Sequence, residues 1–373
     1  MEKKICHVTT VHRATDTRIL RHEAKTIAET GCDVTLIAQH DRNETIDGVR
    51  ILALPRARNR FTRMLGLSWK AFGLALGCKA DLYHLHDPEL LVVGLALKIL
   101  TRARLVRDVH ENLAEQVLNK EWIAAGLRPV VSALVRIAEK VLTRWYDEVV
   151  PATEAIARHI NHPRTTVIHN YPDLGMFHGI YVKPEKEGKG SGPLVYIGGI
   201  SRIRGIYEIL AALDRCSQET DPHLELIGPF SSPMLEAEVR AAPGFRRVNY
   251  RGILPWESAW MRASEAIGGL VLFHPGPNHN EALPNKLFEY MASGIAVIAS
   301  NFPLWQEIVE GSECGITVDP MDIDAISRAM EYLVTNPEEA AEMGKRGRLA
   351  VEETFNWDAE RTKLISAYGR VLA

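Results

Sequence analysis

The sequence has few of the features that mark secreted, membrane-spanning or nucleic-acid-binding proteins. Its five cysteines are scattered and odd in number, with no Cys-x-x-Cys pair, which favours reduced thiols over a disulfide framework. Its longest apolar run, 90–97, is far shorter than the roughly 18–20 residues that span a bilayer. The apolar residues Ile5 to Val8 are too few for a signal peptide. A net charge of −3 gives no reason to expect a nucleic-acid partner. We therefore expect a cytoplasmic protein.

Length and composition predict a two-domain globular chain. The 373 residues are 46% hydrophobic and 24% charged, and they contain no internal repeat or low-complexity tract. Strand–helix–strand patterns fill residues 1–170, stop, and restart at 194. Between them, residues 171–193 are rich in Pro, Gly, Lys and Glu, which is typical of a linker. We predict two parallel-sheet α/β domains, 1–170 and 194–355, followed by a C-terminal helix, 356–373.

The first domain opens with a strand, a helix and a second strand, which predicts a parallel sheet. Ile5–Thr9 is the expected first strand, and Asp16 is expected to cap a helix over 17–30. Ligands of such sheets bind beyond the carboxyl ends of the strands. The residues expected at that edge are Asp16, His86, His110 and Glu111. His84 and His86 share a strand face, but no further ligand completes a metal spacing, so we predict no metal.

The second domain opens with a glycine-containing loop after the strand 194–197. The spacing of Gly198, Gly199 and Gly205 does not fit Gly-x-Gly-x-x-Gly, which argues against a nicotinamide cofactor. Two glycines at a strand end still permit close approach of a ligand to the backbone. Arg202 and Arg204 in the same loop could meet phosphate charge.

The stretch 281–294 carries the most chemistry. It predicts a short helix with Pro284 in its first position and Gly294 at its end. The free N–H groups at its start favour an anion such as a diphosphate, and they belong to Asn285, Lys286 and Leu287. Glu281 and Glu289 frame the site and could accept hydrogen bonds from sugar and ribose hydroxyls. An amphipathic helix with two surface glutamates is the alternative.

This stretch resembles the Glu-x7-Glu signature of the retaining glycosyltransferases of group 1 (family 4). The resemblance implies the GT-B fold, in which two Rossmann-like doubly wound domains face each other across a cleft and the last helix crosses back to the first domain. It implies that Glu281 contacts the donor sugar and Glu289 holds the ribose. The strand ending Asp108-Val109-His110-Glu111 resembles the same family and implies that His110 contacts the donor.

The resemblance assigns roles to three sets of residues. The implied donor-binding residues are Gly198, Gly199, Arg202, Arg204, Ile253, Glu281, Pro284, Asn285, Lys286, Leu287 and Glu289. His110, Glu281 and Arg204 are the implied catalytic residues, and Asp16, His86 and Glu111 lie on the acceptor side. Relatives commonly carry a basic residue where this chain has Gly199, which leaves open whether Arg202 replaces it.

The implied activity is transfer of a sugar from a nucleoside-diphosphate donor, of UDP or GDP type, with retention of configuration. The acceptor would be a glycan or a lipid-linked saccharide in cell-surface polysaccharide synthesis, with no cofactor and no metal. Asp322 and Asp324 invite a metal site, but their place before a helix favours capping. The alternatives are a nucleotide-sugar 2-epimerase of similar fold, a glycoside hydrolase using Glu281 and Glu289, and a non-catalytic binding protein.

Residues 55–79 have basic but no acidic side chains. The basic ones are Arg56, Arg58, Arg60, Arg63, Lys70 and Lys79. Large apolar residues, including Trp69, are interleaved with them. This pattern predicts a helix on an anionic membrane surface, and hence a peripheral membrane protein. A helix packed on the sheet, or a cationic patch for an anionic soluble acceptor, are the alternatives.

Overall fold

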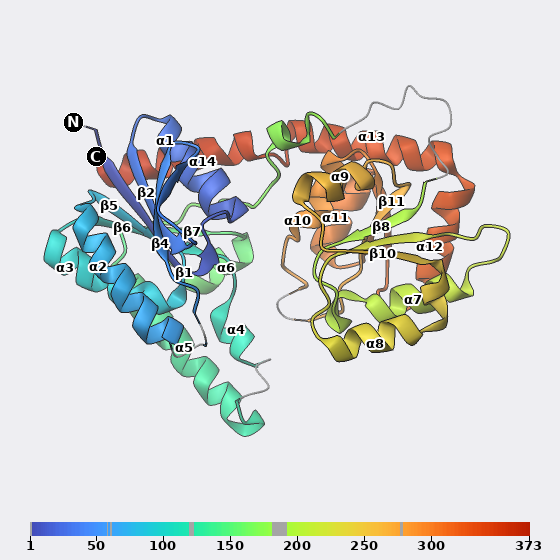
Figure 1. Ribbon diagram of the computed structural model, residues 1–373, viewed down its shortest axis with the longest axis horizontal. Coiled ribbons are helices and arrows are strands. Elements are labelled where there is room, and N and C mark those ends of the chain that lie inside the picture. Colours follow the sequence, from blue (N-terminus) through green and yellow to red (C-terminus); the bar gives the residue numbers. More distant parts are fainter. Residues whose placement is uncertain (1, 58, 60–61, 119–122, 181–191, 277–278) are drawn as a thin grey trace. The chain divides into compact units, whose positions relative to one another are not determined.

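The computed structural model describes residues 2–57, 59, 62–118, 123–180, 192–276 and 279–373 (Figure 1). They form two compact units. Unit 1 comprises Met1–Asn170 and Trp357–Ala373, and unit 2 comprises Tyr171–Asn356. Residues 181–191 of the predicted linker lie outside the described residues, as do Arg58 and Arg60.

Unit 1 is built on a seven-stranded sheet of order β3-β4-β2-β1-β5-β6-β7. The strands are β1 Lys4–Arg13, β2 Asp33–Gln39, β3 Glu44–Ile46, β4 Val49–Leu54, β5 Leu82–Leu85, β6 Arg104–Val109 and β7 Glu148–Pro151. All neighbours pair in parallel except β3 and β4, which form a hairpin at the sheet edge. Asp47 and Gly48 turn that hairpin at φ values of 49° and 80°.

The helices of unit 1 include a wide, π-type turn over Thr17–Ala24 that continues into α1, Lys25–Glu29. The Asp16 carboxylate accepts the Ile19 N–H at 3.1 Å, so the predicted cap is confirmed. The remaining helices are α2 Ser68–Cys78, α3 Leu91–Thr101, α4 Leu113–Leu118, α5 Arg128–Thr143, α6 Glu154–Ile160 and α14 Trp357–Leu372. The C-terminal α14 joins this core, where Trp357 donates its indole N–H to Thr26 at 3.0 Å and Leu364 is fully buried.

Unit 2 has a six-stranded sheet of order β10-β9-β8-β11-β12-β13, parallel throughout. The strands are β8 Leu194–Ile197, β9 Leu224–Ile227, β10 Val248–Gly252, β11 Gly268–Val271, β12 Ala296–Ser300 and β13 Gly315–Val318. The helices are α7 Ile206–Arg215, α8 Pro233–Ala241, α9 Trp256–Ala263, α10 Asn285–Ala292, α11 Pro303–Gly311, α12 Ile323–Thr335 and α13 Pro337–Glu353. Two separate apolar clusters show that helices cover both faces of the sheet.

Both sheets reverse their strand order at one point. In unit 1 the reversal lies between β1 and β5, and in unit 2 it lies between β8 and β11. The loops leaving the two strands at such a point turn to opposite faces, which opens a crevice at the carboxyl edge where ligands bind. The predicted site loops follow these strands.

Two smaller predictions concern helices. Asp322 accepts the Ala325 N–H at 3.0 Å and Asp324 pairs with Arg215, which confirms the capping interpretation of the aspartate pair. Within the part of the chain that the structure describes, no helix combines the length and apolarity needed to cross a bilayer.

Candidate functional site

In unit 2, helix α10 begins at the point where the strand order reverses. Pro284 is the capping residue rather than the first helical one, so the helix begins one residue later than predicted. The Leu287 N–H donates to the Pro284 carbonyl at 3.0 Å, and the expectation that this N–H is free is therefore wrong. Among the described backbone contacts, the N–H groups of Asn285 and Lys286 have no acceptor. They leave two donors at the positive end of the helix dipole.

The position of α10 is fixed by one buried tyrosine. The Tyr290 hydroxyl accepts the Ile197 N–H at 2.8 Å, where β8 ends. A Cβ atom on Gly269 of β11 would lie 2.4 Å from the Tyr290 ring, so only glycine lets the ring pack this closely against the strand. Gly294 ends the helix in the left-handed region at φ 72°, as predicted. The start of α10 is thereby held beside the loop that follows β8.

Two cations share an aromatic floor at this place. The Lys286 side chain is 9% exposed, and its ammonium lies 3.8 Å from the Tyr196 ring centroid and 5.1 Å from that of Phe273. No described residue accepts a hydrogen bond from its Nζ. The Arg204 guanidinium lies 5.6 Å from the Phe273 centroid and donates to the Gly199 carbonyl at 3.0 Å. Aromatic faces stabilise such charges, but a buried ammonium still lacks an anion.

Burial lowers the pKa of Lys286 well below its ordinary value. The Arg204 charge lowers the pKa further, while Glu289 acts in the opposite direction. An anion bound here would favour the charged ammonium, because it would replace the lost hydration and offset Arg204. The pair therefore has the chemistry of a site for a multiply charged anion.

The cation beside Arg204 is Lys286 and not Arg202. The Arg202 side chain is exposed, and its guanidinium lies 5.1 Å from the Tyr207 ring centroid. A Cβ atom on Gly199 would lie 2.8 Å from Arg204 Nη1, so glycine at this position leaves room for that guanidinium. The absence of a basic side chain at Gly199 and the placement of Arg204 are thus linked.

The two glutamates of the motif lie in different environments. Burial raises the pKa of Glu289 to about 7, although a hydrogen bond with Trp256 and the charge of Lys286 both favour ionisation. Glu281 is exposed, and so is Ile253 after β10, with 74% of its surface accessible. Glu289 is therefore a half-buried acceptor beside the cations, whereas Glu281 faces solvent.

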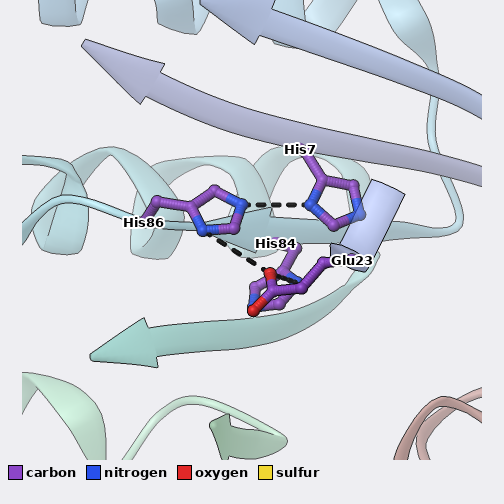
Figure 2. A group of neighbouring side chains, drawn as sticks. All are labelled: His7, Glu23, His84 and His86. Atoms are coloured by element: carbon purple, nitrogen blue, oxygen red, sulfur yellow. Dashed lines mark hydrogen bonds and ion pairs between the residues drawn. The ribbon is translucent and has the colours of Figure 1, made fainter. Parts of the chain in front are cut away.

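In unit 1, a chain of buried side chains lies below the reversal point between β1 and β5 (Figure 2). The Tyr368 hydroxyl is 3.2 Å from His7 Nε2, His7 Nδ1 is 3.0 Å from His86 Nε2, and His86 Nδ1 is 2.9 Å from Asp108 Oδ2. His84 Nδ1 joins at Tyr368, 2.7 Å away. Burial holds the pKa values of His7, His84 and His86 below the ordinary value, so the three rings are neutral.

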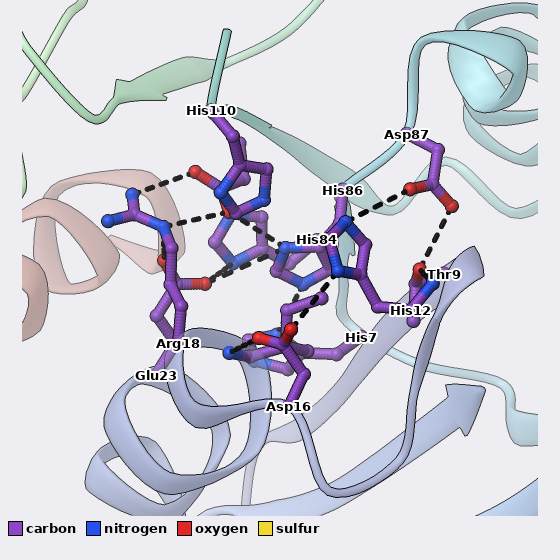
Figure 3. Close-up of polar contacts among 12 residues, drawn as sticks. His7, Thr9, His12, Asp16, Arg18, Glu23, His84, His86, Asp87 and His110 are labelled. Carbon is purple, nitrogen blue, oxygen red and sulfur yellow. Dashed lines mark hydrogen bonds and ion pairs between the residues drawn. The ribbon is translucent and has the colours of Figure 1, made fainter. Parts of the chain in front are cut away.

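Asp108 is the carboxylate on which this network converges. Figure 3 shows four of the residues around it, Arg18, Glu23, His86 and His110. Asp108 accepts two hydrogen bonds from the buried Arg18 guanidinium, at 3.2 and 2.9 Å, and lies 2.9 Å from His110 Nε2. These contacts hold its pKa well below the ordinary range despite complete burial. The Glu23 carboxylate lies 3.1 Å from the Arg18 guanidinium. Burial and the neighbouring Asp108 charge raise the pKa of Glu23. One arginine thus faces two buried carboxylates, and of the two it is Glu23 whose pKa is raised.

The predicted acceptor-side residues do not all reach the surface. His86 is 3% exposed and both of its ring nitrogens are paired, so its assignment as an acceptor contact is corrected to a supporting role. His110 is partly exposed, and Glu111 is exposed. Asp16 binds His12 at 3.1 Å, which together with the helix cap lowers its pKa to about 2. His110 and Glu111 therefore reach the surface at the edge of the sheet, whereas both carboxylate oxygens of Asp16 are held, one by the Ile19 N–H and one by His12.

The arrangement of Arg18, Glu23, Asp108 and His7 was not predicted. These residues lie far apart in the sequence. What they share is that each is polar at a position where the apolar periodicity of its strand or helix predicts a buried side chain. His7 stands inside the apolar strand β1, and Glu23 faces the core from the helix that follows it. A buried polar residue needs a partner, so such positions point to one another.

Four residues of the unit 1 network carry side-chain atoms of the kinds that bind metal ions. Ligand atoms of His7, Glu23, His84 and His86 lie within 4.8 Å of one another, and a second group joins His86, Asp108 and His110. The guanidinium of Arg18 already lies against Glu23 and Asp108, so a metal cation bound by the first group would lie close to a second positive charge. Within the described residues, both Glu23 carboxylate oxygens and His84 Nε2 are buried without a hydrogen-bond partner, so the network leaves some of these ligand atoms unpaired.

The segment 55–79 forms a wide turn over Thr62–Leu67 and helix α2. Trp69 and Met64 are 69% and 51% exposed. Acidic residues from elsewhere reach two of its cations, because Arg63 binds Glu89 at 2.8 Å and Arg56 lies 3.4 Å from Asp41. The charge of this segment is thus partly balanced by the fold.

Comparisons with known proteins find matches in both units of the chain. The model described as glycosyl transferases group 1 matches residues 183–350, and the glycosyl transferase 4-like domain matches residues 17–170. The MMP alpha-(1->4)-mannosyltransferase of Mycolicibacterium hassiacum is 23% identical over 82% of this chain and 75% of its own. A lipopolysaccharide core biosynthesis mannosyltransferase, LpcC of Rhizobium leguminosarum bv. viciae, is 23% identical over 82% and 89%.

The structural comparison confirms the predicted fold class. Anabaena HepE, solved in complex with UDP-glucose, superimposes with a TM-score of 0.74 at 13% identity, covering 98% of this chain and 99% of that one. The chain has the two parallel-sheet α/β domains of GT-B glycosyltransferases.

We predict that the pH dependence of folding reports Glu289. Its carboxyl ionises near 4.5 when unfolded and near 7 when folded, so the folded chain binds the extra proton between these values. Stability contributed by the protonated group is therefore lost as pH rises from 4.5 to 7, by at most about 3 kcal/mol at 1.36 kcal/mol per unit. Glu289→Gln cannot lose it, and its melting temperature relative to wild type should rise across this window. A melting-temperature difference between Glu289→Gln and wild type that does not change with pH would contradict the raised pKa of Glu289.

We also predict unequal costs for the two carboxylates at Arg18. Asp108→Asn leaves the buried guanidinium without its counter-charge and should lower the free energy of unfolding by about 3–5 kcal/mol. Glu23→Gln removes the carboxyl whose pKa burial raises and should cost about 1 kcal/mol or less. Urea titrations of both variants at pH 7 give the comparison. Equal losses of unfolding free energy in the two variants would mean that Asp108 and Glu23 share the negative charge opposite Arg18 equally.

Proposed function

Because the chain belongs to the group 1 glycosyl transferases, we propose that it moves a hexose from a nucleoside-diphosphate sugar to a glycan or lipid-linked saccharide. The observation that carries this proposal is the Lys286–Arg204 pair at the start of α10. Two cations and two free N–H groups converge on a place where no described residue supplies the anion. A diphosphate has the charge and the number of acceptor oxygens to fill it.

The proposed reaction proceeds with retention at the sugar C1. The bond between C1 and the diphosphate oxygen breaks, and the acceptor hydroxyl oxygen bonds to C1 on the face that the diphosphate leaves. The hydroxyl proton passes to the departing phosphate oxygen, so atoms and charges balance. Arg204, Lys286 and the N-terminus of α10 stabilise the negative charge that develops on the leaving group. These groups are already oriented by Tyr290 and Phe273, and they need little rearrangement during the reaction.

The remaining site residues receive proposed roles from their environments. Glu289, half-buried beside the cations, accepts the ribose hydroxyls, and exposed Glu281 contacts the sugar. Gly198 and Gly199 let the ligand approach the backbone, and Ile253 borders the base. In unit 1, His110 contacts the donor sugar and is oriented by Asp108. Asp16 and Glu111 lie on the acceptor side.

The other candidate functions receive less support. A 2-epimerase or a hydrolase would not be expected from family and relatives described as transferases. A non-catalytic binding protein would account for the cation pair but not for the oriented Asp108–His110 contact. UDP and GDP remain the two proposed nucleotide classes, since HepE was solved with UDP-glucose while two relatives are mannosyltransferases.

We predict that the two glutamates affect different parts of the donor. Glu289→Gln removes a charged acceptor for the ribose and should weaken binding of the free nucleoside diphosphate by about 1.5–3 kcal/mol. Glu281→Gln is the matched variant and should leave that affinity unchanged while weakening the intact nucleotide sugar. Calorimetry with UDP, GDP and their glucose and mannose conjugates measures both. Wild-type affinity of Glu289→Gln for the free diphosphate would refute the ribose assignment.

We predict that turnover needs no divalent metal, because side-chain cations and a helix N-terminus offset the charge of the leaving group. The measurement is donor consumption in the presence of an acceptor extract, before and after EDTA treatment. Activity should stay within about twofold. Loss in EDTA that manganese or magnesium restores would contradict this and would direct attention to the His7–Glu23–His84–His86 group.

Segment 55–79 remains a proposed contact with an anionic acceptor or membrane. Its support is the exposed pair Trp69 and Met64 together with the exposed Lys70. The ion pairs of Arg56 and Arg63 reduce its free charge. The chain is proposed to act in the cytoplasm, peripherally attached to the inner face of the membrane.

A further inference from the structure

Helix α5 of unit 1 buries its polar side and exposes its apolar side, the reverse of a typical amphipathic helix in a soluble domain. The side chains that it buries are polar, namely Ser132, Glu139 and Thr143. Large apolar side chains on the opposite side are exposed, each between 55 and 61% accessible: Val130, Leu134, Ile137 and Val141 of the helix, with Leu127 just before it and Trp145 just after it. An amphipathic helix of a soluble domain normally buries its apolar stripe. We call these six residues the α5 stripe.

The inward polar face is satisfied within unit 1. Ser132 donates to the Ala114 carbonyl at 2.7 Å, and Arg107 of β6 binds both Glu139 and Thr143. The helix is therefore held in this orientation by buried hydrogen bonds and an ion pair. Turning it over would leave Arg107 buried without an acceptor. The outward position of the α5 stripe is thus a consequence of the fold.

The stripe is continuous along the helix. Its members recur at intervals of three or four residues from Leu127 to Trp145, which places them on one side of a 3.6-residue repeat. At about 1.5 Å per residue, the stripe is roughly 27 Å long. The end of α3 adds to it, because Lys98 donates to the Trp145 carbonyl at 2.7 Å and the neighbouring Ile99 and Leu100 are exposed.

A row of cations follows one side of the stripe. Arg136, Lys140 and Arg144 recur every four residues, and all three are exposed. Within the part of the chain that the structure describes, none of them forms a hydrogen bond or an ion pair, unlike Arg56 and Arg63 of the 55–79 segment. The cations thus lie next to the apolar side chains on the helix surface, in the arrangement that suits a helix lying in a lipid interface.

We propose that α5 docks on the surface of an anionic lipid bilayer, with the α5 stripe among the acyl chains and the cation row against the headgroups. Charge complementarity favours this occupant over a second copy of the chain. Two copies packed stripe to stripe would bring cation rows together without acids, because the only acidic residue of α5 is Glu139, which is buried and paired with Arg107. An anionic headgroup supplies the missing negative charge.

Docking of α5 on a bilayer would also favour one class of acceptor. If the glycosyl transfer proposed above is correct, on which this step rests, a chain held at a bilayer through unit 1 meets saccharides that are carried on lipid. The lipid-linked class of acceptor is then favoured over a free glycan. The docking surface itself stands on the geometry of α5 alone.

The test is co-sedimentation of the full chain with vesicles of phosphatidylcholine, alone or with about one-third phosphatidylglycerol. Wild type should bind the anionic vesicles and be released by 0.5 M salt. Arg136→Glu/Lys140→Glu/Arg144→Glu should lower the partition coefficient by about a hundredfold or more, since each of the three cations near such a surface contributes roughly fivefold. Leu134→Ser/Ile137→Ser/Val141→Ser should lower it as well. Arg328→Glu/Leu349→Ser, at exposed positions of unit 2, is the matched control and should bind as wild type does.

Three outcomes would overturn the proposal. Wild type could stay in the supernatant with both vesicle types, or the α5 variants could bind as strongly as the control. Light scattering could instead show a dimer that only the serine variant dissociates, which would assign the stripe to self-association. Circular dichroism verifies folding of each variant. Thermal shifts with nucleoside diphosphates separate the two proposals, because α5 variants should keep the shift, and a chain that binds vesicles without any shift would refute only the donor site.

Discussion

The structure depends on how buried charge is compensated. A charged group taken out of water costs several kcal/mol unless another charge or a set of hydrogen bonds replaces its hydration. Unit 1 meets this requirement internally, because Arg18 and Asp108 neutralise each other and the pKa of Glu23 is raised beside them. Unit 2 does not, because Lys286 and Arg204 face each other over Phe273, with Glu289 only partly ionised near neutral pH. The unit that remains unbalanced is the one that needs a ligand.

The same requirement explains why the two units carry different sites on similar sheets. Each sheet reverses its strand order once and opens a crevice at its carboxyl edge. In unit 1 the space below the crevice is filled by a closed network that ends at the partly exposed His110, so a rigid base supports one outward side chain. In unit 2 a helix N-terminus and two cations enter the crevice. One unit presents a positioned imidazole, and the other presents positive charge.

The sequence predicted the repeated α/β plan because apolar strands and helix caps are local signals. The Asp16 and Asp322 caps and the Gly294 terminus were confirmed for that reason. The short edge strand β3 was missed, although Asp47-Gly48 is the dipeptide that favours a two-residue hairpin turn. A three-residue strand has too few positions for its alternation to be recognised, so the turn was its only signal.

The candidate site was less predictable because its chemistry depends on burial. Sequence placed Lys286 at a helix start but could not show that Tyr196 and Phe273 enclose its ammonium, or that Arg202 turns to Tyr207 instead. The unit 1 network joins residues from β1, β5, β6 and α14, and no spacing rule connects positions so far apart. His86 was assigned to the acceptor from its strand-end position, and only the structure shows that its nitrogens are occupied.

Charge counted along the chain is also a poor guide to charge on the surface. Residues 55–79 contain no acid, yet Asp41 and Glu89 approach their arginines from elsewhere in the fold. Helix α5 contains an acid, yet Glu139 points inward to Arg107, and the exposed row of cations is left without a counter-charge. The periodicity of the α5 sequence does not show which side of the helix faces the sheet, because Arg107 on another element determines that orientation. A polar anchor in the core thus decides that an apolar stripe faces outward, and a stripe so placed has to be covered by something other than this unit.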